Sequence, residues 1–305
     1  MLRKILIIAN PGSGKGDAPK YAEALEKVLM NEENPKIDIR ETTKEGDATE
    51  WAKAAKDEGY DTVICLGGDG TVNEVVNGLM MVEEPPVFSF VPIGTANDLG
   101  RVLGFDMTPE NAIEQFRNLE LDKIDIGQVN DLYYMDVVAI GDIPTAVMET
   151  ESDKKNRLGF LAYIIDGAKA IMDEDIKKFE VTDSKGNTYT VESNAILAAL
   201  TSSIGGMENL VEHRKYKDGL FQFIALKGNV VSSTIETLVN DGGAPEGHVD
   251  NDTILAFSDD QLTIKLLDAD EKDKISANVD GDEGPTLPLK IKVHKEALQV
   301  LRPAR

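Results

Sequence analysis

The chain has 305 residues, and its 55 Asp and Glu against 32 Lys and Arg give a formal net charge of −23 at pH 7. A single cysteine, Cys65, and three histidines exclude a disulfide framework and a structural Cys/His zinc site. Such an acidic chain repels phosphate backbones, so we expect no nucleic-acid partner.

Strands and helices alternate in the first third of the chain. Strands are predicted at 4–9, 36–40, 62–66 and 87–91, and helices at 18–31, 49–58 and 72–79. This repeated order is typical of a parallel sheet that is covered by helices. Ligands bind such sheets at the carboxyl ends of the strands, so the loops that follow the strands are the expected site.

Strand-like segments dominate after about residue 125. They are predicted at 132–139, 178–183, 188–192, 195–201, 220–226, 261–267, 274–279 and 289–293. Helices are predicted at 158–172 and 230–239. The change of pattern predicts an α/β domain over residues 1–127, to which the tail at 295–305 returns, and a mostly antiparallel β domain over residues 128–294.

The first residues do not resemble a secretory signal peptide. Only about five apolar residues separate Arg3-Lys4 from Asn10, fewer than such a peptide needs. No stretch approaches the roughly 20 apolar residues that cross a bilayer. We therefore expect a cytoplasmic protein without an integral membrane segment.

A glycine-rich loop lies between the first predicted strand and the first predicted helix. It reads Asn10-Pro11-Gly12-Ser13-Gly14-Lys15-Gly16. Glycines let backbone N–H groups approach an anion, and a helix N-terminus favours negative charge, so the loop is a candidate for phosphate contacts. It matches neither the Walker A nor the G-x-G-x-x-G pattern, and the alternative is a tight strand-to-helix turn.

A second loop, Gly67-Gly68-Asp69-Gly70-Thr71, again follows an apolar strand and leads into a helix. Its glycines clear the approach to the backbone, and Asp69 adds a carboxylate. A carboxylate there can hold Mg²⁺ against phosphates or accept a proton from an attacking hydroxyl. The alternative is that Asp69, or Thr71, only caps the helix.

A third loop completes the pattern at the same predicted edge of the sheet. The segment Pro92-Ile93-Gly94-Thr95-Ala96-Asn97-Asp98 follows the strand predicted at 87–91. Three glycine-containing loops after three parallel strands converge in space. A nucleotide fits that arrangement.

The three loops resemble the signatures of the diacylglycerol kinase catalytic domain, which sphingosine, ceramide and bacterial lipid kinases share. The resemblance continues at 155–163, at Asp218-Gly219-Leu220 and at 278–281, so it covers nearly the whole chain. It is closest to the soluble bacterial diacylglycerol kinases. It implies a nucleotide-binding α/β domain and a β-sandwich domain for the lipid, and phosphorylation of diacylglycerol to phosphatidic acid with ATP and Mg²⁺.

The resemblance also implies roles for individual residues. ATP contacts are expected from Asn10, Pro11, Gly12, Ser13, Gly14, Thr42, Gly68, Asp69, Gly70, Thr71, Val72, Asn73, Glu74 and Thr95. Asp69 is expected to act through Mg²⁺ at the phosphates. In the late motif, Asp280 and Asp282 are expected beside the reacting hydroxyl. Asp282 stands where relatives have Glu, so Asp280, Asp282 and Glu283 stay rival bases, and the alternative is a hairpin turn with exposed acids.

A structural Mg²⁺ in the β domain is a further family feature. Its match here is the Asp218 carboxylate with the backbone carbonyls of Lys215 and Leu220. Oxygen ligands of this kind suit a hard cation, although the pattern of residues alone indicates only a turn. Asp125 stands where the family carries an acid at the domain junction, and we expect it near Lys15 or the catalytic metal.

Other functions stay open at this stage. A kinase for another lipid, a kinase for a soluble acceptor such as the NAD kinases, and a nucleotide-binding regulator without turnover share parts of the pattern. The resemblance implies a homodimer. Contact with the bilayer is expected to be peripheral, through a local basic patch such as 154–157 or 213–217, because the net charge opposes a global attraction.

Overall fold

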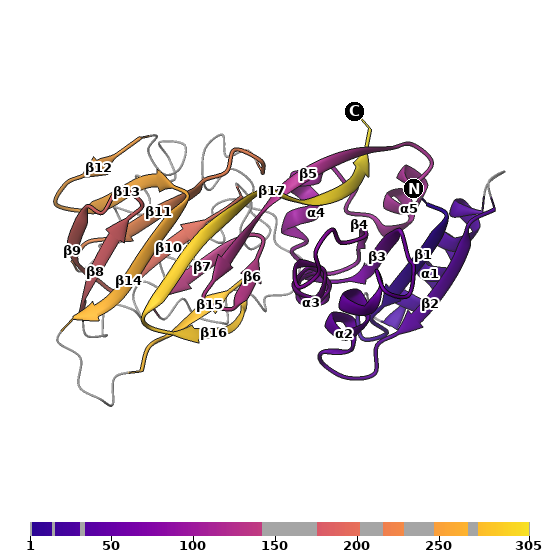
Figure 1. Cartoon of the computed structure of the whole chain (residues 1–305), viewed down its shortest axis with the longest axis horizontal. Coiled ribbons are helices and arrows are strands. Elements are labelled where there is room, and N and C mark those ends of the chain that lie inside the picture. The colour runs from indigo at the N-terminus through magenta and orange to yellow at the C-terminus, as the bar shows by residue number, and fades with distance from the viewer. Residues whose placement is uncertain are drawn as a thin grey trace. The chain divides into compact units, whose positions relative to one another are not determined.

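The computed structural model describes residues 2–13, 16–30, 34–141, 176–201, 216–228, 247–267 and 274–304. They form two compact units, Met1–Ile126 with Glu296–Arg305, and Gly127–Lys295. Two long strands, β5 (Leu119–Val129) and β17 (Leu289–Pro303), contribute residues to both units (Figure 1). None of the described helices is long and apolar enough to span a membrane.

The first unit is an α/β layer structure around a mostly parallel sheet. Its strands follow the order β2-β1-β3-β4-β17, and every described pairing along this path is parallel. The strands are β1 (Lys4–Ala9), β2 (Lys36–Glu41), β3 (Thr62–Gly67) and β4 (Val87–Pro92), and the helices are α1 (Ala18–Leu29), α2 (Asp47–Ala54), α3 (Asp69–Met80), α4 (Asp98–Leu103) and α5 (Pro109–Gln115). β3 and β4 are buried along their whole length, as parallel strands between helices are. The α/β fold predicted for this part of the sequence is confirmed.

The second unit is built from two mainly antiparallel sheets. One contains β17, β14 (Gln261–Leu267), β8 (Lys177–Asp183) and β9 (Thr188–Ser193), and a hairpin of β5 and β6 (Leu132–Tyr134) lies beside β17. The other follows the order β12 (Val249–Asp250), β13 (Ile254–Asp259), β11 (Phe221–Leu226), β10 (Ala195–Ala199), β7 (Val137–Ile140), β15 (Ser276–Val279) and β16 (Asp282–Thr286). The predicted antiparallel β domain is confirmed.

Side chains from both sheets of the second unit share one core. Phe179, Leu262 and Ile291 come from the first sheet, and Phe221 and Phe223 come from the second. Alternate residues of β11 (Phe221, Phe223 and Ala225) and of β8 (Phe179 and Val181) face this core, which is the pattern of a β-sandwich. The helices predicted at 158–172 and 230–239, and the motif at 155–163, lie outside the described residues.

Candidate functional site

The first glycine-rich loop is tied to the start of α3. The side-chain amide of Asn10, directly after β1, donates to Thr71 Oγ1 at 2.9 Å. Its side-chain oxygen accepts the N–H of Gly12 at 2.9 Å, which shapes the turn. The N–H of Gly68 donates a longer bond of 3.4 Å to Ser13 Oγ. Polar side chains of the first loop therefore hold it against the second loop.

The second and third loops meet at glycines. A Cβ on Gly94 would lie 2.6 Å from the Cα of Gly68, and a Cβ on Gly68 would lie 3.2 Å from the Cα of Gly94. A Cβ on Gly67 would lie 2.4 Å from the Cβ of Thr71. These positions admit no side chain without movement of their neighbours, so the two loops are in backbone contact.

Asp69 links α3 to α4. Its two carboxylate oxygens accept the backbone N–H groups of Asn97 at 2.9 Å and Asp98 at 3.1 Å. Asn97 has a positive φ of 52° and closes its own loop with two 2.9 Å bonds to the backbone of Gly94. Asp69 therefore caps the neighbouring helix. The N-cap of its own helix is Gly68, so neither Asp69 nor Thr71 serves as the cap of α3.

The segment between β2 and α2 contains the predicted Thr42. The N–H and hydroxyl of the adjacent Thr43 both donate to Asp47 Oδ2 at 2.8 Å. These bonds from Thr43 hold the pKa of Asp47 below its usual range. The Thr42 hydroxyl makes no such bond to any described residue, so Thr42 is the better placed of the two threonines to meet a ligand.

Glu74 has a role that the sequence did not indicate. Its carboxylate accepts the N–H of Gly46 at 3.1 Å, at the N-terminus of α2, and its backbone carbonyl accepts the Thr49 hydroxyl at 3.0 Å. Burial raises the pKa of Glu74, although the N–H groups of this helix start oppose the rise. Glu74 thus joins α3 to α2 and positions the segment that carries Thr42.

The remaining predicted contacts surround the first turn of α3. Gly12, Gly70 and Thr95 are exposed, Pro11, Ser13 and Asn73 are half-buried, and Val72 is buried, while Gly14 lies outside the described residues. The first N–H groups of an α-helix have no partner within the helix and favour an anion. Backbone donors at the N-terminus of α3 are therefore the centre of the candidate phosphate site.

Asp125 lies in the first unit and is almost completely buried. Its carboxylate accepts the N–H of Glu296 at 2.7 Å. Glu296 has a positive φ of 48°, so this bond stabilises an unusual backbone conformation within β17. Lys15, the partner expected from the sequence, lies outside the described residues.

In the second unit, Asp280 is held by backbone groups. Its carboxylate accepts the N–H groups of Met135 at 2.7 Å, Asp136 at 3.0 Å and Val137 at 2.8 Å. Met135 and Asp136 form the break between β6 and β7, and Val137 begins β7, whereas a single strand was predicted over 132–139. That prediction was wrong at this point, because the backbone turns its donors toward Asp280 instead of a neighbouring strand.

The two other acids of the late motif open β16. Asp282 and Glu283 are both exposed, and Glu283 Oε1 accepts a 3.4 Å bond from the Ser276 hydroxyl. Gly281 has a positive φ of 102°, so the segment turns tightly between β15 and β16. The exposed acids lie on a hairpin, whereas Asp280 faces the backbone of the second unit.

The predicted structural metal site is described in part. Asp218 Oδ1 accepts the N–H of Leu220 at 3.1 Å, and Gly219 between them has a positive φ of 83°. This turn brings the carboxylate beside the segment that carries the Leu220 carbonyl. Lys215, the third predicted ligand, lies outside the described residues.

Comparison with known proteins gives the family. Residues 4–129 match the family model of the diacylglycerol kinase catalytic domain. A diacylglycerol kinase of Bacillus subtilis is 31% identical over 290 residues, 94% of this chain and 92% of that protein. One of Staphylococcus aureus is 32% identical over 292 residues, 94% of this chain and 89% of that protein. The chain belongs to the diacylglycerol kinase family.

Solved structures agree with the fold of this diacylglycerol kinase family member. A crystal structure of a diacylglycerol kinase from Bacillus anthracis superimposes with a TM-score of 0.75 at 21% sequence identity, and the match covers 98% of this chain and 97% of that chain. Such a likeness supports the two-domain architecture. Together with the relatives above, family membership supports a lipid kinase function.

Proposed function

We propose that the chain transfers the γ-phosphoryl group of ATP, with Mg²⁺, to the free hydroxyl of diacylglycerol and so forms phosphatidic acid. The observation that carries the proposal is the backbone contact between Gly68 and Gly94 beneath the first turn of α3. It brings two loops together without intervening side chains, and the loop from Asn10 to Ser13 joins them by hydrogen bonds. The resulting surface of N–H groups suits a triphosphate.

Side chains of this site fall into two groups. Asn10, Thr71 and Glu74 have their polar atoms engaged with other loops, so we assign them to positioning. Backbone groups from Gly12 and from Gly68 to Thr71, with the side chains of Thr42 and Thr95, are the proposed ATP contacts. In phosphoryl transfer, positioning and electrostatic stabilisation supply most of the catalysis.

Mg²⁺ fits the chemistry of Asp69. Each carboxylate oxygen accepts one backbone N–H and keeps lone-pair capacity for a second partner. Within the part of the chain that the structure describes, no three His, Cys, Asp or Glu side chains form a metal cluster. A metal ion at this site would therefore be held by Asp69, water and the nucleotide phosphates, which is usual for Mg²⁺. It would neutralise charge that develops on the phosphate oxygens.

Proton transfer is assigned to the late motif. Three backbone donors surround the Asp280 carboxylate, so we assign Asp280 to holding the break between β6 and β7. Asp282 is exposed on the adjacent hairpin and occupies the position where the family resemblance implies Glu. We therefore propose Asp282 as the base that accepts the proton of the acceptor hydroxyl. Asp218, with the Leu220 carbonyl and with Lys215, is the proposed ligand set for a second, structural Mg²⁺.

The test measures labelled phosphatidic acid after incubation with ATP, Mg²⁺ and diacylglycerol in mixed micelles. A general base contributes about 10²- to 10⁴-fold to the rate, so Asp282→Asn should lower kcat by that factor while ATP binding stays unchanged. Asp282→Glu introduces the side chain that the family resemblance implies and should retain activity. Asp280→Asn should instead lower the stability of the second unit.

Three outcomes separate the competing functions. If the wild-type protein binds ATP but forms no lipid product, the lipid kinase proposal fails, and the protein is a kinase for a soluble acceptor or a nucleotide-binding regulator. Turnover of another lipid, without turnover of diacylglycerol, keeps the kinase and changes the acceptor. Full activity of Asp282→Asn refutes the assignment of the base. Because diacylglycerol resides in bilayers, the proposal includes peripheral membrane contact at the cytoplasmic face, and sedimentation of the intact protein tests the expected homodimer.

A further inference from the structure

Tyr134 is a buried polar residue of the second unit that no step of the proposed reaction uses. Its side chain is completely buried and belongs to the core between the two sheets, together with Val129, Val138 and Val279. The hydroxyl forms no hydrogen bond to any described residue. A phenol hydroxyl in an apolar core loses its hydration without a compensating bond, which makes Tyr less stabilising than Phe at this position. Folding alone therefore does not explain the hydroxyl.

The ring of Tyr134 is fixed by Gly127, its partner across the β5–β6 hairpin. A Cβ on Gly127 would lie 2.2 Å from Cζ of the ring, the atom that carries the hydroxyl. The ring therefore lies directly on the backbone of β5, and only glycine permits this contact. The position of the hydroxyl is thus set by the fold.

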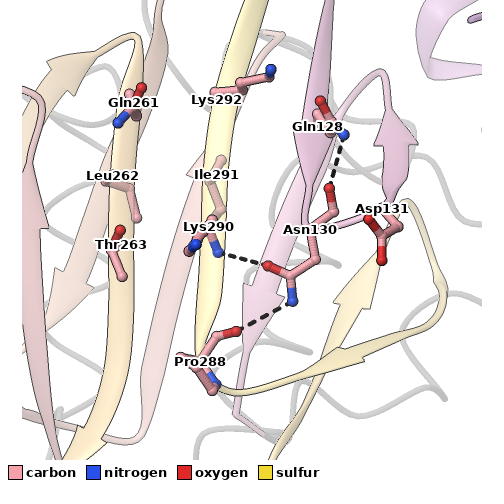
Figure 2. A pocket seen from close by; sticks show the side chains of 10 residues that line it. All are labelled: Gln128, Asn130, Asp131, Gln261, Leu262, Thr263, Pro288, Lys290, Ile291 and Lys292. Atoms are coloured by element: carbon pink, nitrogen blue, oxygen red, sulfur yellow. Dashed lines mark hydrogen bonds between the residues drawn. The ribbon is translucent and has the colours of Figure 1, made fainter.

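The hairpin itself is attached to β17 by hydrogen bonds in the wall of a pocket beside that strand (Figure 2). Asn130 Oδ1 accepts the N–H of Lys290 at 2.8 Å, and Asn130 Nδ2 donates to the carbonyl of Pro288 at 3.2 Å. Gln128 Nε2 donates to the carbonyl of Asn130 at 2.8 Å. These bonds hold the strands that carry Gly127 and Tyr134, so the phenol is a preorganised group.

The phenol lies beside the late motif. Asp280 accepts the N–H of Met135, the residue after Tyr134, at 2.7 Å, and Asp282 begins β16 two residues later. Burial raises the pKa of Tyr134, and the negative charge of Asp280 raises it further. The phenol therefore stays a neutral hydrogen-bond donor, in the same region of the second unit as the proposed base.

Tyr134 also lies at a margin of the sandwich. Within the described part of the chain, β6 pairs with β5 alone, and β16 ends the order of the other sheet. The bond from Met135 to Asp280 joins these two margins. Ile275 and Leu287, which flank β15 and β16, are half-buried and pack against the shared core. The margin therefore presents apolar side chains to an apolar chain that enters between the sheets.

The surroundings of the hydroxyl select the kind of group that it can bind. An anionic oxygen would be repelled by Asp280 and would lose its hydration in the apolar core. A carbonyl oxygen is neutral and accepts a hydrogen bond from a phenol. An acyl ester joins such an oxygen to an apolar chain, and in a diacylglycerol the esters are separated by only a few bonds from the free hydroxyl. Tyr134 and Asp282 can therefore act on the same lipid.

We infer that the Tyr134 hydroxyl donates a hydrogen bond to an ester carbonyl of the acceptor lipid and thereby selects acylglycerols over lipids that lack this carbonyl. The inference rests on the proposed function and adds a specificity-determining residue to it. Tyr134 takes no part in proton transfer or in the binding of ATP or metal. A site that donates to an oxygen of its substrate rejects an analogue without that oxygen, because the buried donor is then left unpaired.

The experiment compares a diacylglycerol with the dialkylglycerol of equal chain length, in which ethers replace both esters, as acceptors in mixed micelles. The wild type should favour the diacylglycerol in kcat/KM by about tenfold, the effect of one hydrogen bond. Tyr134→Phe should lower kcat/KM for the diacylglycerol by this factor, mainly through KM, and leave the dialkylglycerol unaffected. Tyr133→Phe is the matched control, because it removes the hydroxyl of the next residue, whose side chain lies on the opposite face of β6.

Each outcome decides the matter. If Tyr134→Phe keeps the wild-type preference for the ester lipid, or if Tyr133→Phe loses it equally, the inference is overturned. A hydroxyl that serves only the fold would make Tyr134→Phe less stable in thermal unfolding and slow the turnover of both lipids alike, which also overturns it. Wild-type turnover of both lipids without preference refutes this inference alone, whereas the absence of product from either lipid refutes the proposed function as well.

Discussion

The contact between Gly68 and Gly94 gives a quantitative test of how the nucleotide site is built. In Gly94→Ala, the new methyl group would lie 2.6 Å from the Cα of Gly68 and 2.8 Å from Asn97 Oδ1. The first neighbour is backbone and cannot rotate away. The second makes the bond that closes the third loop. The two loops must therefore move apart.

The loss of stability expected for Gly94→Ala follows from these contacts. Overpacking of a well-packed region costs about 1–3 kcal/mol. The shift also strains the two Asn97–Gly94 bonds and the bond from Asn97 to Asp69, which are worth about 1 kcal/mol each when lost. We expect the free energy of unfolding of the first unit to fall by about 3 kcal/mol. ATP affinity should fall further than this loss explains, because the first turn of α3 no longer faces the third loop.

The chain offers a probe that reports on the first unit alone. Trp51, on α2, is the single tryptophan of the sequence, so urea unfolding followed by its fluorescence measures the stability of this unit. Calorimetry with ATP measures binding on the same samples. Gly104→Ala is the control: Gly104 has a positive φ of 84° and no neighbour within 4 Å of a new Cβ. It should cost about 1 kcal/mol through its backbone conformation and leave ATP binding intact.

One result would refute the reasoning. If Gly94→Ala unfolds within about 0.5 kcal/mol of the wild type, as ordinary surface substitutions do, and binds ATP normally, the two loops are not in the contact described. If Gly104→Ala impairs ATP binding as strongly as Gly94→Ala, the effect is one of general stability. Gly68→Ala, with its nearest contact at 3.2 Å, should give an intermediate effect.

Three further predictions concern buried groups. The hydroxyl of Tyr134 is buried with no hydrogen-bond partner among the described residues. Tyr134→Phe should therefore leave the stability measured by thermal unfolding unchanged or raise it by about 1 kcal/mol. A loss of stability above that value would reveal a partner of the hydroxyl. Burial raises the pKa of Glu74, so the folded state holds this proton more tightly than the unfolded state. As the pH rises from the ordinary glutamate range toward neutrality, the wild type should therefore lose stability relative to Glu74→Gln. Urea titrations in which the two proteins show the same pH dependence of stability would contradict this. Burial also raises the pKa of the Cys65 thiol. A disulfide reagent should therefore titrate no thiol in the native protein and one thiol per chain in urea. Rapid reaction of the thiol in the native protein would mean that β3 opens readily.

Hydrophobic periodicity predicted much of the fold. The strands β1 and β3 and the alternation around them follow from apolar runs that a buried parallel sheet requires. β5 was missed because the acidic residues Glu120 and Asp122 alternate with the two leucines of its first half, so this half has no apolar run. Those charges are matched by a residue far away in the sequence, since Arg302 forms a 2.8 Å ion pair with Asp122. A pattern read locally gives no sign of such a partner.

The convergence of the three loops could be predicted from the sequence, but the contacts of their individual side chains could not. Glycines after strands predicted that three loops meet at one edge of the sheet, and the contacts of Gly68 with Gly94 and of Asn10 with Thr71 confirm that meeting. The structural roles of Asn97 and Glu74 depend on contacts between loops. Asn tolerates a positive φ better than most residues, so Asn at position 97 is a weak local signal of the left-handed turn before α4. For Glu74 the partner N–H belongs to Gly46, 28 residues earlier, and nothing in the sequence marks that pair.

Contacts within the protein explain most positions of the Gly-Gly-Asp-Gly-Thr motif at residues 67–71. Gly67 makes room for Thr71, Gly68 meets Gly94, and Asp69 caps α4. The motif therefore holds three loops together through contacts within the protein, and under the proposed function it would contact phosphate through its backbone N–H groups. A substitution at Asp69 removes the α4 cap and the proposed metal ligand together, so loss of activity in Asp69→Ala cannot distinguish the two. Rescue by a metal ion of different ligand preference, at unchanged stability of the first unit, is the observation that would assign Asp69 to the metal.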